Sequence, residues 1–412
     1  MIKNFLVFVF TGTSILFADL IIYDKNFSPY AGGQDLITGD SAILDLQDRL
    51  SRPHPENNFL AKLDRLINQV LISTPLNLWV TIFQHEVFGH GYRIRDIGSA
   101  NASVTGYQIV IDYPFGGGSG ATNYRITDQL TIQQMVAIQI AGTEATAILA
   151  NQLKNRWIKS RHIKARQGTL YIYSQQDLLN YVYSTPEQSY TLENGNDITA
   201  YIYWMNLYFP NCNLTLNELK SMAWINLLDP MTFYSVYQQI SYIFTGEEVQ
   251  IPMISAGKVD FLPNLRYSLS PSGPEVYVEL FSRIQDDPLY VYFKWGNYTG
   301  IPSYGVGFEH PRCIPFFHDR IGLRLNLFRE LVAENNLKAL DYIVDPSKEQ
   351  ALESYGGIKT RYGYSFHFLY SPTFGQSSIQ PHLELGYKSH GFVQGESLVE
   401  AVILRGGLEF SY

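Results

Sequence analysis

Residues 80 to 93 contain the grouping whose chemistry is clearest. They read Val-Thr-Ile-Phe-Gln-His-Glu-Val-Phe-Gly-His-Gly-Tyr-Arg, so two histidines, His85 and His90, bracket Glu86, which directly follows the first of them. Zinc hydrolases use this combination, because neutral imidazole nitrogens hold the metal and a neighbouring carboxylate takes a proton from bound water. We therefore expect a catalytic zinc centre at these three residues.

The spacing of the histidines sets a condition on the helix that carries them. The usual zinc-binding helix has its histidines four residues apart, on one face. Here His85 and His90 are five positions apart, which on a regular helix separates their directions by roughly 140°. A π-type widening at Phe88–Gly89 would bring both to one metal, and such bulges are frequent at functional sites. The alternative is a helix whose histidines only cap or hydrogen-bond in a core.

The pattern His-Glu-x-x-Gly-His-Gly resembles the hexapeptide motif of the dipeptidyl peptidase III family, zinc peptidases of the gluzincin type. The resemblance implies that His85 and His90 are zinc ligands and that Glu86 is the general base. That family draws its third ligand from a glutamate on a following helix, which points to Glu144, a lone carboxylate in an apolar stretch. Since the resemblance covers residues 85 to 91 only, exopeptidase specificity is not carried over.

Glu144, Tyr92 and Arg93 each have a functional and a structural interpretation. A carboxylate buried among Ala, Ile and Leu is costly unless it is neutralised or paired. Coordination of zinc by Glu144 would achieve this, and so would an ion pair with an arginine or lysine. Tyr92 and Arg93 directly follow the motif, where they could polarise a carbonyl oxygen or bind a substrate carboxylate, or simply support the fold.

The elements expected to position these residues are helical. Apolar residues recur at helical spacing in residues 59–92, 130–157 and 214–244. A β-rich stretch, 102–113, runs into the Gly-Gly-Gly-Ser-Gly of residues 116–120, which we interpret as a flexible loop because the Lys and Ser/Thr of a phosphate-binding loop are missing. We expect a mainly helical metallopeptidase-like domain over residues 19–255.

From about residue 256 the apolar pattern changes to a period of two, typical of strands with two different faces. Eight segments show it, around residues 265–269, 276–280, 289–295, 304–308, 321–327, 362–370, 383–387 and 402–410. Several reach about ten residues, enough for a tilted strand to cross a bilayer. The terminal Tyr412 resembles the C-terminal aromatic signature of bacterial outer-membrane barrels. We expect an α+β protein whose residues 256–412 form an antiparallel transmembrane β-barrel of about eight strands, with a soluble β domain as the alternative.

The N-terminus predicts export. Residues 1–18 combine Lys3, an apolar run and Ala18 before the first acid, as a cleaved signal peptide does; a buried strand or a membrane anchor is the alternative. No helix of about 20 apolar residues is expected after it. Cys212 and Cys313 are too few for a disulfide framework, and a single bridge between them stays open.

Composition narrows the function classes. The net charge is −8 and no long basic run occurs, which argues against nucleic acid as a partner. The 30 Tyr and 24 Phe suit the aromatic girdles of a membrane barrel.

The sequence therefore predicts a Zn2+-dependent peptidase of the bacterial outer membrane that contacts lipid and acts on a peptide or protein, with its oligomeric state open. The alternative is a structural, adhesive or transport barrel with a non-catalytic metal site. Glu86 favours the peptidase, because a purely structural zinc site prefers four protein ligands and does not need a free carboxylate beside its first histidine.

Overall fold

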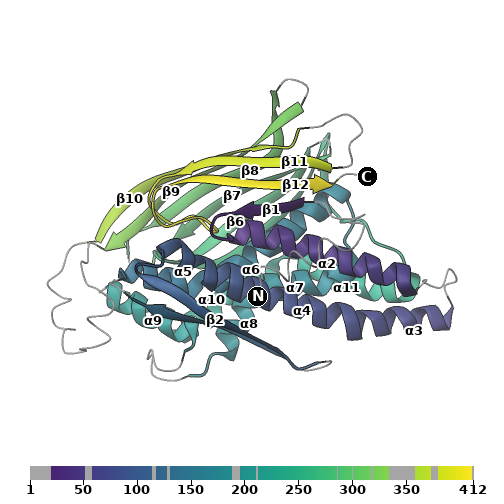
Figure 1. The fold of residues 1–412 in the computed structure, drawn as a ribbon, viewed down its shortest axis with the longest axis horizontal. Coiled ribbons are helices and arrows are strands. Elements are labelled where there is room, and N and C mark those ends of the chain that lie inside the picture. Colours follow the sequence, from purple (N-terminus) through teal and green to yellow (C-terminus); the bar gives the residue numbers. More distant parts are fainter. Residues whose placement is uncertain are drawn as a thin grey trace.

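A large antiparallel sheet lies against a group of helices in this protein (Figure 1). The computed structural model describes residues 20–51, 58–113, 117–127, 130–187, 195–209, 212–284, 286–298, 300–316, 319–333, 358–372 and 379–410. The expected combination of helices with an antiparallel sheet is confirmed. The expected signal peptide at residues 1–18 and the terminal Tyr412 lie outside the described residues.

The helices gather on one side of the sheet. They are α2 (Pro29–Ser51), α3 (Phe59–Asn68), α4 (Thr74–Phe83), α5 (Gly91–Ile97), α6 (Ile132–Ser160), α7 (Gly168–Gln175), α8 (Asp177–Ser184), α9 (Asp197–Tyr208), α10 (Leu216–Ala223) and α11 (Pro230–Thr245). Two π-helical segments, η1 (Gln69–Ser73) and η2 (Gln84–His90), join α3, α4 and α5 into one stretch. This stretch, Phe59–Ile97, is long and apolar enough to cross a membrane by length and composition alone, so the expectation that no such helix follows the signal was wrong.

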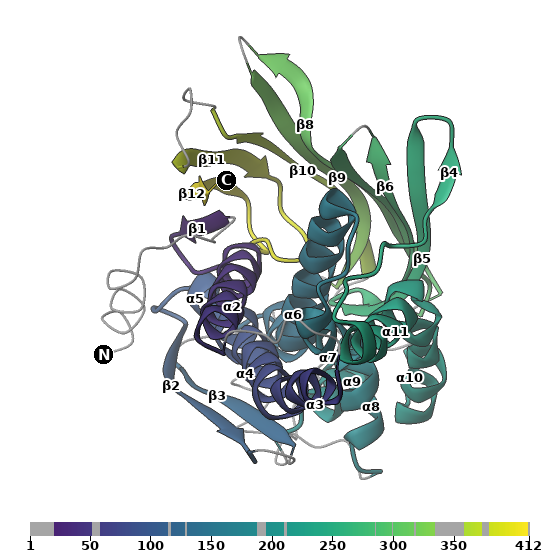
Figure 2. The same cartoon turned by 90° about the vertical axis from the view of Figure 1, so that its right-hand side faces the viewer.

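The sheet contains ten strands in the order β1-β12-β11-β10-β9-β8-β7-β6-β5-β4. They are β1 (Leu20–Asp24), β4 (Ile254–Ala256), β5 (Val259–Ser270), β6 (Gly273–Ile284), β7 (Asp287–Gly296), β8 (Ser303–Phe316), β9 (Asp319–Ala333), β10 (Ile358–Tyr370), β11 (Ile379–Lys388) and β12 (Ala401–Phe410). The eight strands expected after residue 256 are β5 to β12. Within the described residues, the edge strands β1 and β4 do not pair with each other, so the sheet is open. It curves as an arch around α2 and α6 (Figure 2).

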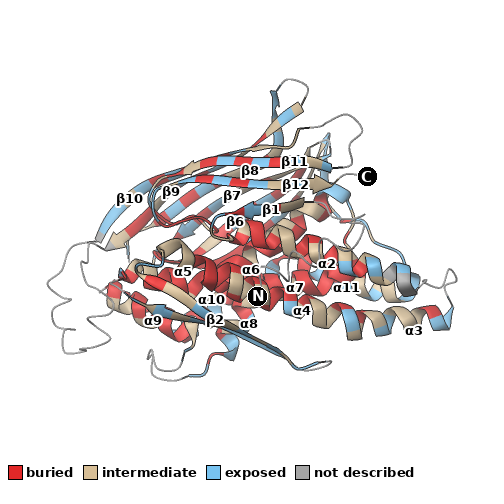
Figure 3. Ribbon diagram, in the orientation of Figure 1, coloured by how far each residue is buried: buried red, intermediate tan, exposed pale blue. Residues whose placement is uncertain are grey.

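The inner face of the sheet carries buried charged side chains beside apolar ones, and the outer face carries large exposed apolar side chains. Along the strands buried and exposed residues alternate (Figure 3). The buried side chains of the inner face include Arg266, Glu279, Lys294, Arg324, Glu384 and Arg405. The exposed side chains of the outer face include Val278, Phe293, Leu327, Tyr362, Val402 and Leu404. Charged groups are thus enclosed between sheet and helices, and large apolar groups point outward.

Helices and sheet share their apolar cores across the expected boundary at residue 256. One cluster joins Trp157 of α6 to Leu262 of β5 and Phe281 of β6. In addition, β1 precedes the helices in sequence but pairs with β12. The helical and strand-rich parts of the chain therefore pack as one body.

The structure also describes the glycine-rich segment and the two cysteines. The glycine-rich segment expected to be a flexible loop instead contributes Gly118 to Gly120 to a strand, β3 (Gly118–Ile126), which pairs antiparallel with β2 (Ala102–Ile111). The backbone hydrogen bonds of this hairpin explain the difference, since the two glycines of β3 do not prevent pairing with a partner strand rich in β-branched residues. Cys212 and Cys313 are both free thiols.

Candidate metal centre

The helix carrying the histidines is widened where the spacing requires it. Residues Gln84–His90 form the π-helical segment η2, which contains the Phe88–Gly89 position expected for the bulge. The ring centroids of His85 and His90 are 5.0 Å apart. The extra residue in the turn therefore brings two side chains, which a regular helix would have separated, to the same side.

Close packing of η2 on α6 depends on two glycines. A Cβ atom at Gly89 would lie 2.6 Å from the carbonyl oxygen of Ala141, and a Cβ atom at Gly142 would lie 2.0 Å from His85 Nε2. Both distances are far shorter than van der Waals contact. The imidazole of His85 thus occupies space that only a glycine at position 142 leaves open.

The Nδ1 atom of each imidazole lies within hydrogen-bond distance of an acceptor oxygen. His85 Nδ1 lies 2.8 Å from Asp177 Oδ2, and His90 Nδ1 lies 2.7 Å from the carbonyl oxygen of Ile138. Asp177 also accepts a hydrogen bond of 2.8 Å from Thr146 Oγ1. Because a carbonyl oxygen and a carboxylate only accept, each Nδ1 carries the hydrogen when the ring is neutral and each Nε2 keeps its lone pair. This arrangement is the usual one for zinc-bound histidines.

The carboxylate that lies close to both histidines is that of Asp197, at the start of α9. Its Oδ2 lies 3.2 Å from His90 Nε2 and accepts a hydrogen bond of 2.9 Å from Tyr181 Oη. One ligand atom from each of His85, His90 and Asp197 lies within 4.8 Å of the other two. Two imidazoles and one carboxylate are a typical donor set for a catalytic zinc ion, so these residues fit the metal that the sequence predicted.

Glu86 lies beside this group without belonging to it. The side chain is buried, and Thr122 Oγ1 on β3 donates a hydrogen bond of 2.7 Å to its Oε2. Gly120 allows the close approach, since a Cβ atom there would lie 2.6 Å from Glu86 Oε1. The β2–β3 hairpin thus fixes the Glu86 carboxylate, which is not one of the three grouped ligands.

The electrostatics of the group favour a cation. Burial lowers the pKa of His90, but the negative charges of Asp197 and Glu86 outweigh burial and raise the pKa to about 9. Burial likewise opposes protonation of His85, and Asp177 reverses its effect, so that the pKa of His85 is raised. The Asp197 pKa is lowered despite burial because His90 is next to it. Three carboxylates around two imidazoles therefore attract positive charge, as protons or as a metal ion.

The structure does not bring Glu144, Tyr92 and Arg93 to the histidines. Glu144 forms a buried ion pair with Arg93 and accepts a hydrogen bond of 2.5 Å from the Gly395 amide. Tyr92 is buried, and the Arg93 guanidinium lies 5.5 Å from its ring centre. Glu144 follows Gly142 by two residues, which turns its side chain about 200° around the helix. It points away from His85, and the arginine pairing that the sequence left open is the one found.

Asp177 and Asp197 were missed by the sequence analysis. They lie 92 and 112 residues after His85, so no short motif links them to it. Asp197 follows the helix cap Asn196, whose side chain accepts from the Thr199 amide. An Asn-Asp pair at a helix start is fully explained by capping, which conceals a ligand role.

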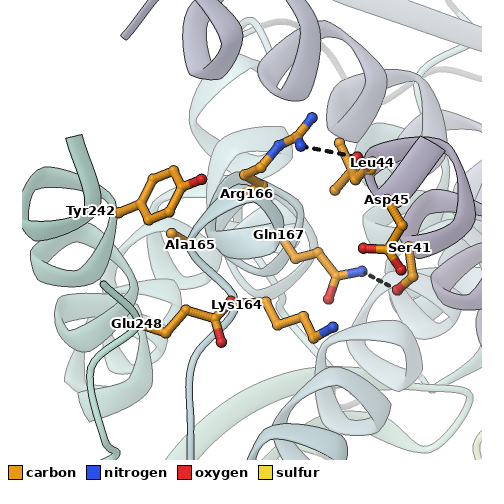
Figure 4. A pocket seen from close by; sticks show the side chains of 9 residues that line it. All are labelled: Ser41, Leu44, Asp45, Lys164, Ala165, Arg166, Gln167, Tyr242 and Glu248. Atoms are coloured by element: carbon orange, nitrogen blue, oxygen red, sulfur yellow. Dashed lines mark hydrogen bonds between the residues drawn. The ribbon is translucent and has the colours of Figure 1, made fainter. Parts of the chain in front are cut away.

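A polar cavity lies elsewhere in the molecule (Figure 4). It has a volume of about 80 Å³, enough for a few water molecules. Its lining comes from α2, residues 164–167 and the end of α11, and Gln167 Nε2 donates a hydrogen bond of 3.0 Å to Ser41 Oγ across it. A second hydrogen bond among the lining residues runs from Arg166 Nη1 to the carbonyl oxygen of Leu44.

Comparisons with known proteins return no match: no family model, no curated protein and no solved structure is similar to this chain.

Proposed function

We propose that this protein is a zinc-dependent peptidase in which His85, His90 and Asp197 hold the metal and Glu86 is the general base. The observation that carries the proposal is the convergence of these three ligands beside a buried carboxylate that is not one of them. Three protein ligands are the number typical of catalytic zinc, whereas structural zinc takes four. Asp197 replaces Glu144 as the proposed third ligand.

Each surrounding residue has a definable task in peptide hydrolysis. Zinc supplies Lewis acidity that makes water a nucleophile at neutral pH. Asp177 and the Ile138 carbonyl hold the two imidazoles in orientation through their Nδ1 atoms. One carboxylate oxygen of Glu86 accepts a proton from the attacking water and passes it to the leaving amine. Thr122 keeps this carboxylate in place through its hydrogen bond.

The test replaces Glu86 by glutamine, which has nearly the same shape but cannot accept the proton. Glu86→Gln should keep its zinc and its fold and lose about 10²- to 10⁴-fold in turnover. The assay compares cleavage products of envelope proteins between cells carrying the native protein and the variant. Glu187→Gln, an exposed glutamate paired with Lys220, is the matched control and should behave as native. Identical product profiles for native zinc-loaded protein and Glu86→Gln would indicate a metal-binding membrane protein without catalysis.

The proposal places the protein in the bacterial outer membrane, exported by residues 1–18, with the strands after residue 256 as a lipid-facing barrel. Support comes from the two faces of the sheet, since charged side chains are enclosed and large apolar ones point outward, as in transmembrane barrels. We also propose that the sheet closes into a barrel in the membrane. Recovery of the mature protein in the membrane fraction, with a band whose mobility changes on heating, is the expected result. Full solubility after osmotic release would contradict it.

A further inference from the structure

A second group of potential ligands lies under the sheet, apart from the histidines of η2. It consists of His367 on β10, Glu384 on β11 and Glu396 in the connection between β11 and β12, and one ligand atom from each lies within 4.8 Å of the other two. All three side chains are at most 2% exposed. Sequence analysis gave His367 no role.

Hydrogen bonds fix where the His367 proton lies. His367 Nδ1 is 2.7 Å from Glu384 Oε1, and the same oxygen accepts hydrogen bonds from Arg324 at 2.9 Å and from Arg405 at 2.6 Å. A carboxylate bound by two guanidinium groups is ionised and can only accept. Nδ1 therefore carries a hydrogen, and in the neutral ring Nε2 presents a lone pair.

That lone pair faces another acceptor. His367 Nε2 lies 3.8 Å from Glu396 Oε1, and within the described residues neither atom has a hydrogen-bond partner. Glu396 Oε2 accepts a hydrogen bond of 2.9 Å from Arg405, which leaves Oε1 as the oxygen that faces the ring. Two unpaired buried acceptors that face each other are unfavourable unless something positive lies between them.

The separation fits a metal ion better than a proton. A direct N–H···O bond would bring the two atoms to about 2.7–3.2 Å, and they are 3.8 Å apart. Two ligands each at about 2.1 Å from one ion would subtend an angle of about 130° at this separation, within the range of metal coordination.

The balance of charges around the two arginines also favours a cation. Arg324 and Arg405 form ion pairs with four carboxylates, those of Asp24, Glu309, Glu384 and Glu396. Four carboxylates against two guanidinium groups leave a formal excess of two negative charges when His367 is neutral. Such an excess is costly where the carboxylates are buried, as those of Glu384 and Glu396 are, and a divalent ion would offset it.

We infer that His367 and Glu396, with Glu384 beside them, bind a divalent transition-metal ion. An imidazole nitrogen with carboxylate oxygens suits ions such as zinc. The ion links β10 to the connection between β11 and β12, in which the Gly395 amide donates to Glu144 on α6. It thereby fastens this connection between the sheet and the helix that packs on η2.

The experiment counts zinc in the full-length protein, purified in detergent, saturated with Zn2+ and then dialysed against a weak chelator. His90→Ala should disrupt the centre on η2 and still retain one zinc per chain. Adding His367→Gln or Glu396→Gln to it should remove that zinc. The matched control adds His382→Gln, a buried histidine on β11 whose Nδ1 is bonded to Ser371, and should leave it in place.

His90→Ala protein that holds no zinc would overturn the inference, and so would an unchanged zinc content after His367→Gln. The same measurement tests the proposed zinc centre on η2 separately. If that centre does not exist, the native protein will contain no more zinc per chain than the His90→Ala variant. If the double variants do not fold, the count in His90→Ala alone still decides between one ion and none.

Discussion

Replacing Gly142 by alanine should strongly weaken zinc binding on η2 with little effect on the fold. Gly142 lies in α6 directly against His85, and a Cβ atom there would be 2.0 Å from His85 Nε2. Ordinary contact for these atoms is about 3.5 Å, so the imidazole must move by about 1.5 Å. The perturbed atom is the nitrogen that would bind the metal.

The expected size of the effect follows from these distances. Zinc sites tolerate ligand displacements of about 0.2 Å, so a displacement several times larger removes His85 from the ligand set. Loss of a hydrogen-bond partner of a ligand already costs about 10- to 100-fold in metal affinity, and loss of the ligand itself should cost more. Overpacking should lower the free energy of unfolding by about 1–3 kcal/mol, and the better helix propensity of alanine should offset about 1 kcal/mol of this loss.

The assay combines zinc titration by competition with a chelator and thermal unfolding followed by circular dichroism. Gly39→Ala is the matched control, because it lies within α2 and a Cβ atom there meets no atom within 4 Å. We expect weak zinc binding in Gly142→Ala, native binding in Gly39→Ala and cooperative unfolding in both. Native zinc affinity in a folded Gly142→Ala protein would refute the placement of His85 as a ligand.

Three further predictions concern carboxylates. Asp197→Asn should weaken zinc binding strongly. Glu144→Gln should keep the zinc and lower the free energy of unfolding by about 3–5 kcal/mol, because it leaves Arg93 buried without its charge partner. If zinc titration shows weak binding in Glu144→Gln and native binding in Asp197→Asn, Glu144 is the ligand. Asp177→Asn should lower zinc affinity by about 10- to 100-fold through the loss of a charged partner at His85 Nδ1, and unchanged affinity would show that Asp177 does not act on the metal. Burial raises the pKa of Asp40 to about 7, so the folded state keeps a proton that the unfolded chain releases near pH 4. The contribution of Asp40 to the free energy of unfolding should therefore fall as pH rises from about 4 to 7. Thermal unfolding of the native protein and Asp40→Asn across this range checks it, and identical pH profiles would contradict it.

The sequence by itself determined the elements whose signal is local. Alternation with a period of two located the eight strands from β5 to β12, because side chains on a strand alternate between faces whatever covers them. The five-residue spacing of His85 and His90 predicted a π-type bulge at Phe88–Gly89, since helix geometry alone relates spacing to direction. The nearness of Glu86 to both histidines followed from the same local geometry.

Only the tertiary structure decided which distant groups meet these residues. Asp177 and Asp197 reach the histidines through the packing of α8 and α9 on α6, which no local pattern encodes. Glu144 was expected beside the histidines and is paired with Arg93 instead, because a buried carboxylate in an apolar helix needs a positive partner and sequence does not say whether a metal or an arginine provides it. The pairing of β1 with β12 and the meeting of His367 with Glu396 likewise join residues that are far apart along the chain. Such contacts depend on how complete elements pack together, so the sequence of any one element cannot specify them.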